Sequence, residues 1–289
     1  MSGREMNRRT ALKAGLAASV LAPMAGVLRG EPESAVRSGR IRQSVCRWCY
    51  AKMSLDELCR QAAEMGLAGI DLLEQVEWDV PLRYGLKCTM GYAGGGSIQD
   101  ALNRVEHHAE IEANFRKLIP LAAKAGVANV ITFSGNRKGL TDEDGVRNTV
   151  AGLSRVKKIA EDHGVTICLE LLNSKVNHPD YMADHTAWGA RVMQEVNSPH
   201  VKLLYDIYHM QMMEGDLIAT IRKNIAWIGH FHTGGVPGRH ELDKSQEVQW
   251  DAVMNAIAET GFRGYVAHEF IPVHDPMTGL RAAVKLCDV

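Results

Sequence analysis

The feature that most constrains this fold is an alternation of short apolar runs with amphipathic helical patterns, which repeats along most of the chain. The first run, 43–48, is followed by Ser54-Leu55-Asp56-Glu57, a capping box that predicts the start of a helix, and by Gly66, which predicts its end. Strands that alternate with helices are typical of βαβ units in a parallel sheet. The expected strands are 43–48, 67–73, 87–92, 129–133, 165–172, 201–208, 225–233 and 265–271.

Helical patterns separate these runs and follow the last of them. The segment 79–85, which contains Pro81, reads as a helix or a loop. The glycine-rich segment 91–97 reads as a flexible loop, because it lacks the lysine and the spacing of a phosphate-binding loop. Residues 41–289 match the roughly 250 residues of a single (β/α)8 TIM barrel, with an open doubly wound sheet as the alternative. The other expected helices are 54–65, 103–125, 141–163, 184–195, 214–224, 247–260 and 277–286.

The first forty residues differ from the rest of the chain. Arg8 and Arg9 precede an uncharged apolar stretch, 14–28, which is too short to cross about 30 Å of hydrocarbon comfortably. Paired arginines before such a stretch are typical of a twin-arginine export signal. We therefore expect 1–30 to be a signal segment, 31–40 a polar linker, and the protein to be periplasmic or otherwise extracytoplasmic. No clear cleavage site follows, so membrane attachment through a retained signal segment stays open.

Composition narrows the class of partner. The chain has 33 Lys and Arg against 34 Asp and Glu, and aromatic residues make up 6% of it. Because nucleic-acid binders usually carry a basic excess and stacking aromatics, no nucleic-acid partner is expected. Two of the six cysteines, Cys46 and Cys49, form a C-x-x-C on an expected strand, where residues i and i+3 face opposite sides. Free or structural thiols are therefore favoured, with a disulfide or redox pair as the alternative.

Acidic and histidine side chains occur near the ends of the last four expected strands. Glu170 and Asp206 are the only acids in VTICLELL and KLLYDIYH, and Glu269 lies in YVAHEFI. His230 and His232 share one face of the strand in WIGHFHTGG, so spacing does not say which is a ligand. Carboxylates in such apolar runs are costly unless paired or bound to metal, and the carboxyl ends of barrel strands converge. This pattern predicts a site for Mg²⁺ or Mn²⁺, with Zn²⁺ as the alternative.

The region around Asp206 resembles a known family. Residues 204–217 read LYDIYHMQMMEGDL, which is similar to the hydroxypyruvate isomerase signature Y-D-I-Y-H-M-Q-x-M-E-G. The segments 168–173, 228–230, 237–241 and 264–270 follow in that family's order and spacing. The chain from residue 41 onward therefore resembles hydroxypyruvate isomerases, within the xylose isomerase-like barrels that also include ketose 3-epimerases and endonuclease IV-like enzymes.

The resemblance implies a divalent metal held by Glu170, Asp206, His232 and Glu269. It also implies that Glu170 and Glu269 are the catalytic acid/base pair. One departure concerns residue 232, which is His, as in ketose epimerases, where the hydroxypyruvate isomerases carry Gln.

The resemblance also implies substrate contacts. His209 and Arg239 would contact substrate oxygens, and Glu241, in the same motif as Arg239, is also expected to bind substrate. Trp48, at the end of the first expected strand, would either pack on a sugar face or belong to the core. The Pro-Gly that follows the position of Glu241 in the family is absent here, which leaves the substrate open.

These parts predict a metal-dependent isomerase that acts on a small keto acid or sugar through an enediolate, as hydroxypyruvate isomerases do. A keto-sugar 3-epimerase, or a keto-glycoside lyase or hydratase, would use the same parts. A periplasmic sugar-binding protein with a vestigial site is the alternative outside enzymes. The sequence leaves open whether the chain forms a homo-oligomer.

Overall fold

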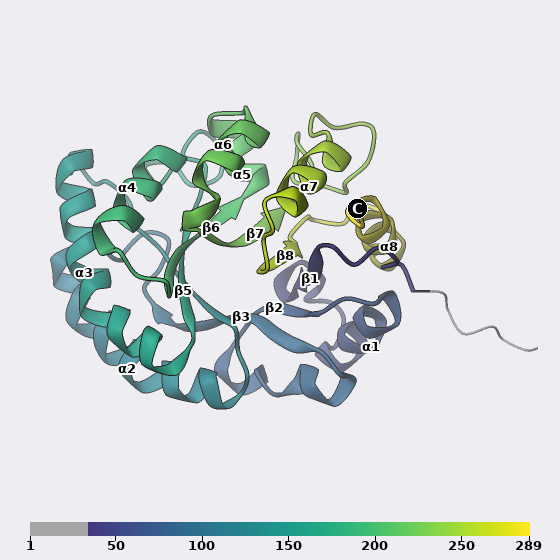
Figure 1. Ribbon diagram of the computed structural model, residues 1–289, viewed down its shortest axis with the longest axis horizontal. Coiled ribbons are helices and arrows are strands. Elements are labelled where there is room, and N and C mark those ends of the chain that lie inside the picture. Colours follow the sequence, from purple (N-terminus) through teal and green to yellow (C-terminus); the bar gives the residue numbers. More distant parts are fainter. Residues whose placement is uncertain (1–33) are drawn as a thin grey trace, which may run out of the picture. The chain divides into compact units, whose positions relative to one another are not determined.

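The computed structural model describes residues 34–289, so the expected signal segment and the start of the expected linker lie outside the described residues. Within this part of the chain, parallel strands surround one axis and helices cover their outer side (Figure 1). The strands are β1 (Arg42–Cys46), β2 (Gly69–Leu73), β3 (Lys87–Gly95), β4 (Asn129–Thr132), β5 (Thr166–Leu171), β6 (Val201–Asp206), β7 (Ile228–Thr233) and β8 (Tyr265–His268).

The sheet closes on itself. Each strand pairs with the next in sequence, and β8 pairs with β1 through the register Arg42↔Tyr265 to Val45↔His268. An open doubly wound sheet would leave both edge strands unpaired on one side. The prediction of a single TIM barrel is therefore confirmed.

Helices follow most of the strands, close to their expected positions. The expected helix starts are capped as the sequence indicates, since the Ser54 hydroxyl accepts from the Glu57 amide and the Thr141 hydroxyl accepts from the Asp144 amide. Between β2 and β3 the return is made by 3₁₀ turns, Gln75–Glu77 and Val80–Tyr84. The helices are α1 (Leu55–Met65), α2 (His108–Lys124), α3 (Asp142–His163), α4 (Thr186–Val196), α5 (Ile207–Met213), α6 (Leu217–Asn224), α7 (Trp250–Glu259) and α8 (Pro276–Leu286).

The glycine-rich segment 91–97 is not a flexible loop along its whole length, because β3 continues to Gly95. A Cβ on Gly91 would lie 2.5 Å from the Trp78 Nε1 atom, and one on Gly95 would lie 2.5 Å from the Ile131 carbonyl oxygen. These glycines allow neighbouring groups to approach the strand closely, a role of glycine that the loop interpretation overlooked.

Two boundaries near the carboxyl ends of the strands also differ from expectation. The expected strand 201–208 ends at Asp206, because the Asp206 carboxylate accepts from the His209 amide and caps α5. The expected strand 265–271 ends at His268, so Glu269 is the first residue after β8. The long helix expected from residue 103 begins at His108, after a 3₁₀ turn at Val105–His107.

Residues 34–40, in the expected linker, pack against the amino end of the barrel. The Ala35 amide donates to the Met65 carbonyl at the end of α1, at 3.0 Å. The Asp288 carboxylate, just after α8, accepts from the amides of Arg37, Ser38 and Gly39 at 2.5–2.8 Å. Helices of a βα barrel end at the amino end of the strands, so the chain enters at that end. None of the helices in the described part is long and apolar enough to span a membrane.

Candidate active site

The four side chains expected to bind metal meet at the carboxyl end of the barrel. Glu170 lies in β5, Asp206 ends β6, His232 lies in β7, and Glu269 directly follows β8. Each side chain offers one ligand atom, and these atoms all lie within 4.8 Å of one another. All four residues are buried. The structure thus brings together the residues that the sequence placed on four separate strands.

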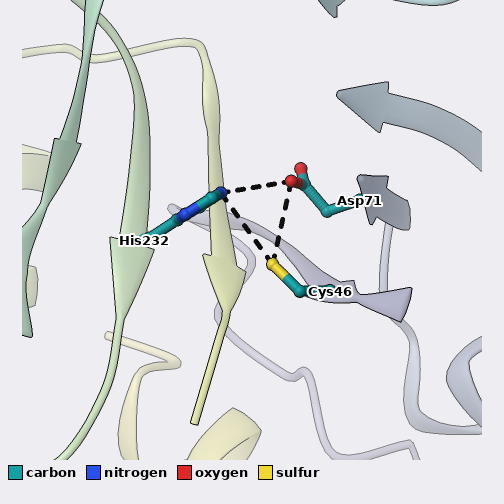
Figure 2. Close-up of side chains that lie close together, drawn as sticks. All are labelled: Cys46, Asp71 and His232. Carbon is teal, nitrogen blue, oxygen red and sulfur yellow. Dashed lines mark hydrogen bonds and ion pairs between the residues drawn. The ribbon is translucent and has the colours of Figure 1, made fainter. Parts of the chain in front are cut away.

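His232 is held so that its two ring nitrogens face different neighbours. Its Nε2 atom lies 3.1 Å from Asp71 Oδ1, on β2, and 3.8 Å from the Cys46 sulfur at the end of β1 (Figure 2). Its Nδ1 atom faces Glu269 Oε2 at 2.8 Å and Glu170 Oε1 at 3.3 Å. A carboxylate that accepts from one nitrogen of a histidine leaves the other nitrogen available to a metal.

The residues fit a divalent metal on the evidence of His232 Nδ1. This atom is fully buried and has no hydrogen bond of acceptable geometry to any residue in 34–289, although two carboxylates lie beside it. The buried Nδ1 atom and one oxygen from each of three carboxylates converge on one point, which is the arrangement of a divalent-metal site. Three carboxylates and one imidazole are the donors that suit Mg²⁺ or Mn²⁺, and Zn²⁺ also accepts them.

The electrostatics of the three carboxylates agree with this reading. Burial, only partly offset by Arg239, raises the pKa of Asp206 to about 7, and burial likewise raises the pKa of Glu170. Burial would also raise the pKa of Glu269, but Arg239 and His232 outweigh it and hold this pKa well below its usual range. Three acids this close repel one another when ionised, and a divalent cation would remove the repulsion.

Arg239 and Trp48 both contact Glu269. Arg239 Nη2 lies 2.6 Å from Glu269 Oε2 and 3.2 Å from Asp206 Oδ2. Trp48 Nε1 donates to Glu269 Oε1 at 2.6 Å, and the Arg239 guanidinium lies 5.4 Å from the centre of the Trp48 ring. Trp48 lies in the 3₁₀ turn Arg47–Tyr50 that follows β1 and is 40% exposed, so it is not a core residue.

His209 points one nitrogen into the cluster and fixes the other on a neighbour. Its Nδ1 atom accepts from the Asn173 backbone amide at 3.1 Å, and a backbone amide is always a donor. The proton of the neutral ring therefore lies on Nε2, which is buried, 3.6 Å from Asp206 Oδ2, and without a hydrogen bond in the described chain. Burial and the nearby Arg239 charge lower the pKa of His209 well below its usual value, which keeps the ring neutral. His209 can thus offer one N–H donor to a bound oxygen.

The structure does not bring Glu241 to the cluster. Its carboxylate accepts instead from the amides of Val273 and His274, in the loop after β8, at 2.9 and 3.1 Å. Both Gly238 and Arg239 have positive φ, so the chain turns sharply there and sequence neighbours face different sides. Glu241 supports a loop here and does not face the cluster.

Two supporting residues were not singled out from the sequence. Asp71 accepts from Thr89 Oγ1 at 2.9 Å and faces both His232 and His230, whose Nε2 lies 2.9 Å from Asp71 Oδ2. Burial would raise the pKa of Asp71, but the two histidines outweigh it and lower the pKa. Asp71 stands alone among apolar neighbours in its strand, the same signal that identified Glu170 and Asp206. Asn173, which directs His209, carries no comparable signal.

His230 lies nearer the amino end of β7 than His232 does. Its ring nitrogens contact Asn129 and Asp71 rather than the carboxylates of the four-residue cluster. This placement decides between the two histidines that the spacing left equivalent. All six cysteines are free, and Cys49 lies in the turn after β1 rather than on the strand.

A family model for the xylose isomerase-like TIM barrel matches residues 83–288. The chain belongs to this family. The match covers most of the barrel, including all four residues of the cluster, and agrees with the resemblance seen in the sequence.

Curated relatives of this family member include proteins named as isomerases and one named as a 3-epimerase. A human protein named "Putative hydroxypyruvate isomerase" is 27% identical over 226 residues, which cover 76% of this chain and 69% of that protein. A 2-oxo-tetronate isomerase from Cupriavidus necator is 30% identical over 174 residues, 58% of this chain and 66% of that protein. At these identities the relatives share the family but do not fix one reaction.

A solved structure confirms the architecture. The AP endonuclease, family 2, from Brucella melitensis superposes with a TM-score of 0.76, covering 83% of this chain and 97% of its own. Its sequence is 23% identical, so the likeness concerns the fold alone.

Proposed function

We propose that this protein is a divalent-metal-dependent isomerase that moves a proton between neighbouring carbons of an α-hydroxy carbonyl substrate, a small keto acid or sugar. The observation that carries the proposal is the orientation of His232. Its Nε2 faces Asp71, and its buried Nδ1 faces Glu170 and Glu269 beside Asp206. A sugar-binding protein would need no such set of buried acids.

Glu170, Asp206, His232 and Glu269 would hold the metal, with Mg²⁺ or Mn²⁺ favoured by the three carboxylates. A bound divalent metal acts as a Lewis acid, which polarises a carbonyl and stabilises developing negative charge on oxygen.

Glu170 and Glu269 are placed to move the proton. They come from β5 and from the end of β8, on the two sides of Asp206 and His232 along the barrel wall. One carboxylate takes the carbon-bound proton beside the carbonyl, which leaves an enediolate, and the other returns a proton to the neighbouring carbon. The hydroxyl proton passes to the former carbonyl oxygen, so the reaction is balanced without an oxidant. Return to the opposite face of the same carbon would instead give epimerisation.

Two further side chains would hold the substrate oxygens. His209 Nε2–H is a neutral donor aimed into the site. The Arg239 guanidinium, nearly buried and flanked by the Trp48 and Tyr208 rings, supplies a positive charge beside Glu269. Such preformed donors stabilise charge that develops on a substrate oxygen during the reaction.

The test is solvent deuterium exchange in the metal-loaded protein with a panel of hydroxypyruvate, ketoses and 3-keto sugars. Deuterium incorporation beside one carbonyl would identify the substrate, and the product would separate isomerase, 3-epimerase, and lyase or hydratase. Failure of every member of the panel to exchange, with metal bound, would contradict the proposal.

We also propose export by the twin-arginine route, on the strength of Arg8 and Arg9 before the apolar stretch. The measurement is cell fractionation of the full chain against an Arg8→Lys, Arg9→Lys variant. Equal distribution of the two would contradict it.

A further inference from the structure

A cleft of about 750 Å³ lies beside the active site, between the turn after β1 and the loop after β8. Trp48 and Met53 line it from the first segment, and Ile271 and Pro272 line it from the second. The volume is in the range of small-molecule sites in proteins, about 300–1,000 Å³. It exceeds what a three-carbon keto acid at the metal ligands requires.

Trp48 connects this cleft to the chemistry. Its indole N–H is bonded to Glu269 Oε1 at 2.6 Å, yet the same residue lines the cleft and is 40% exposed. A molecule in the cleft would therefore contact the ring that positions one of the proposed acid/base groups. Ile271 belongs to the loop that starts at Glu269, and its amide donates to the Arg239 carbonyl. Both walls of the cleft are thus continuous with the site.

The lining combines an apolar wall with polar groups. This composition suits a sugar ring, which is apolar on its face and carries hydroxyls at its edge. Trp48, and Ile271 at 42% exposure, give an apolar wall open to solvent. Lys52, Glu57 and His274 place charged or polar groups on the same lining. An indole packs against apolar faces, while polar groups around it can bind hydroxyls.

We propose that this cleft is a subsite for the non-reacting sugar ring of a keto-glycoside, whose reactive α-hydroxy carbonyl lies at Glu170 and Glu269. This inference rests on the proposed function for the reaction, and it narrows the substrate class from small keto acids to glycosides of two rings. The second ring stacks on Trp48, and its hydroxyls face Lys52, Glu57 and His274.

Binding can be tested without turnover. Cellobiose and maltose, which carry no reactive ketone, are titrated into the metal-loaded protein by calorimetry. The matched variants are Ile271→Arg, which fills the cleft, and Val273→Arg, a neighbouring exposed position outside the lining. Saturable binding of either disaccharide that weakens about 10-fold or more in Ile271→Arg and persists in Val273→Arg supports the subsite. Absence of binding by both, or binding insensitive to Ile271→Arg, overturns it.

Kinetics give a second readout once a reactive pair is found in the exchange panel. The ratio of kcat/KM for a 3-keto disaccharide to that for a single-ring or three-carbon substrate should fall about 10-fold or more in Ile271→Arg and Met53→Arg. Val273→Arg should keep the ratio of the parent protein. An unchanged ratio in both cleft variants overturns the subsite.

The two proposals fail in different ways. If no compound exchanges deuterium but disaccharides bind in the cleft, the isomerase proposal is wrong and a sugar site remains. If small substrates exchange and the cleft variants change nothing, the isomerase proposal holds and the subsite is wrong.

Discussion

The two ends of the barrel differ in how fully their polar side chains are hydrogen-bonded. At the carboxyl end, Glu170, Asp206 and Glu269 crowd around one imidazole whose Nδ1 has no hydrogen bond within the described chain. At the amino end, the Asp288 carboxylate accepts from three successive amides, and Gln43 is bonded to both the Val284 carbonyl and His268. The amino end therefore has the arrangement expected for stability. The carboxyl end places three acids close together, an arrangement that is costly unless the proposed cation binds.

The largest expected effect comes from removing one acid at the carboxyl end. Glu170→Gln and Glu269→Gln should each lower the rate of deuterium exchange by about 10²–10⁴-fold, because an amide cannot take up the carbon-bound proton. Metal-free Glu170→Gln should melt no lower than the parent protein, since one buried, repelling charge has gone, whereas metal-free Glu269→Gln should melt lower, because it loses the ion pair with Arg239. Glu259→Gln, on the exposed side of α7, is the matched control. A normal exchange rate in either site variant would remove the acid/base assignment.

Removing the metal should affect both activity and stability. Chelation is expected to lower the exchange rate by up to the same factor as the loss of one acid, and added Mn²⁺ or Mg²⁺ should restore it. At a metal concentration 100-fold above Kd, the loaded protein should be about 2.7 kcal/mol more stable than the chelated one. Metal analysis together with thermal unfolding measures both changes. Full activity in protein shown to be metal-free would contradict the proposed mechanism.

We expect an effect of intermediate size at Asp71, because this residue does not face the proposed metal position but contacts His232, which does. Asp71→Asn should weaken metal affinity by about 10–100-fold, the usual effect of losing a carboxylate behind a histidine ligand. Metal titration of the apoprotein gives the affinity, and exchange at saturating metal should recover much of the parent rate. Asp79→Asn, at an exposed position shortly after β2, is the control. Unchanged affinity in Asp71→Asn would mean that His232 does not depend on this contact.

The smallest effect is expected at the amino end. Burial would raise the pKa of Asp288, but the amides of Gly39, Ser38 and Arg37 outweigh it and lower the pKa. The stabilisation is thus present above the unfolded-state pKa of about 4 and is lost as pH falls through the folded-state value. Asp288→Asn should lower the free energy of unfolding by about 0.5–1 kcal/mol at pH 7, since the carboxylate is partly exposed and solvent screens its bonds, and the difference should shrink in acid.

Denaturant unfolding at several pH values measures this effect. The exchange rate of folded Asp288→Asn should match the parent protein. A slower rate would show that the two ends of the barrel are coupled.

The sequence predicted the fold because hydrophobic periodicity and capping residues are local signals. It also predicted Glu170, Asp206 and Glu269 as a group, since a carboxylate is conspicuous in an apolar strand and strand ends converge in a barrel. Asp71 meets the same criterion. Asp71 differs in its position, because it lies on β2 and faces His232 on β7, across the barrel. The sequence does not reveal this contact, since it depends on how side chains pack inside the barrel.

Other features depend on contacts that no local pattern encodes. His230 and His232 share a strand face, so only the packing inside the barrel separates them. Glu241 follows Arg239 closely in sequence, but the turn between Gly235 and His240 directs it to another loop. The tautomer of His209 depends on Asn173, which is brought near by the loop after β5. The glycines of β3 predict a loop when only the sequence is considered. The structure shows that they allow neighbouring groups to lie close to the strand.

The hydrogen bonds from residues 37–39 to Asp288 also determine where a tag or a support can be joined without covering the carboxyl end of the barrel. They fasten residues 37–39 to the amino end of the barrel, which is opposite the end that holds the proposed metal ligands. A purification handle or a surface linkage attached at residue 34 would leave the carboxyl end of the barrel turned outward. A fusion partner joined after Val289, close to Asp288, would lie at the same amino end of the barrel. Samples immobilised through residue 34 or through Val289 should therefore keep the carboxyl end of the barrel accessible.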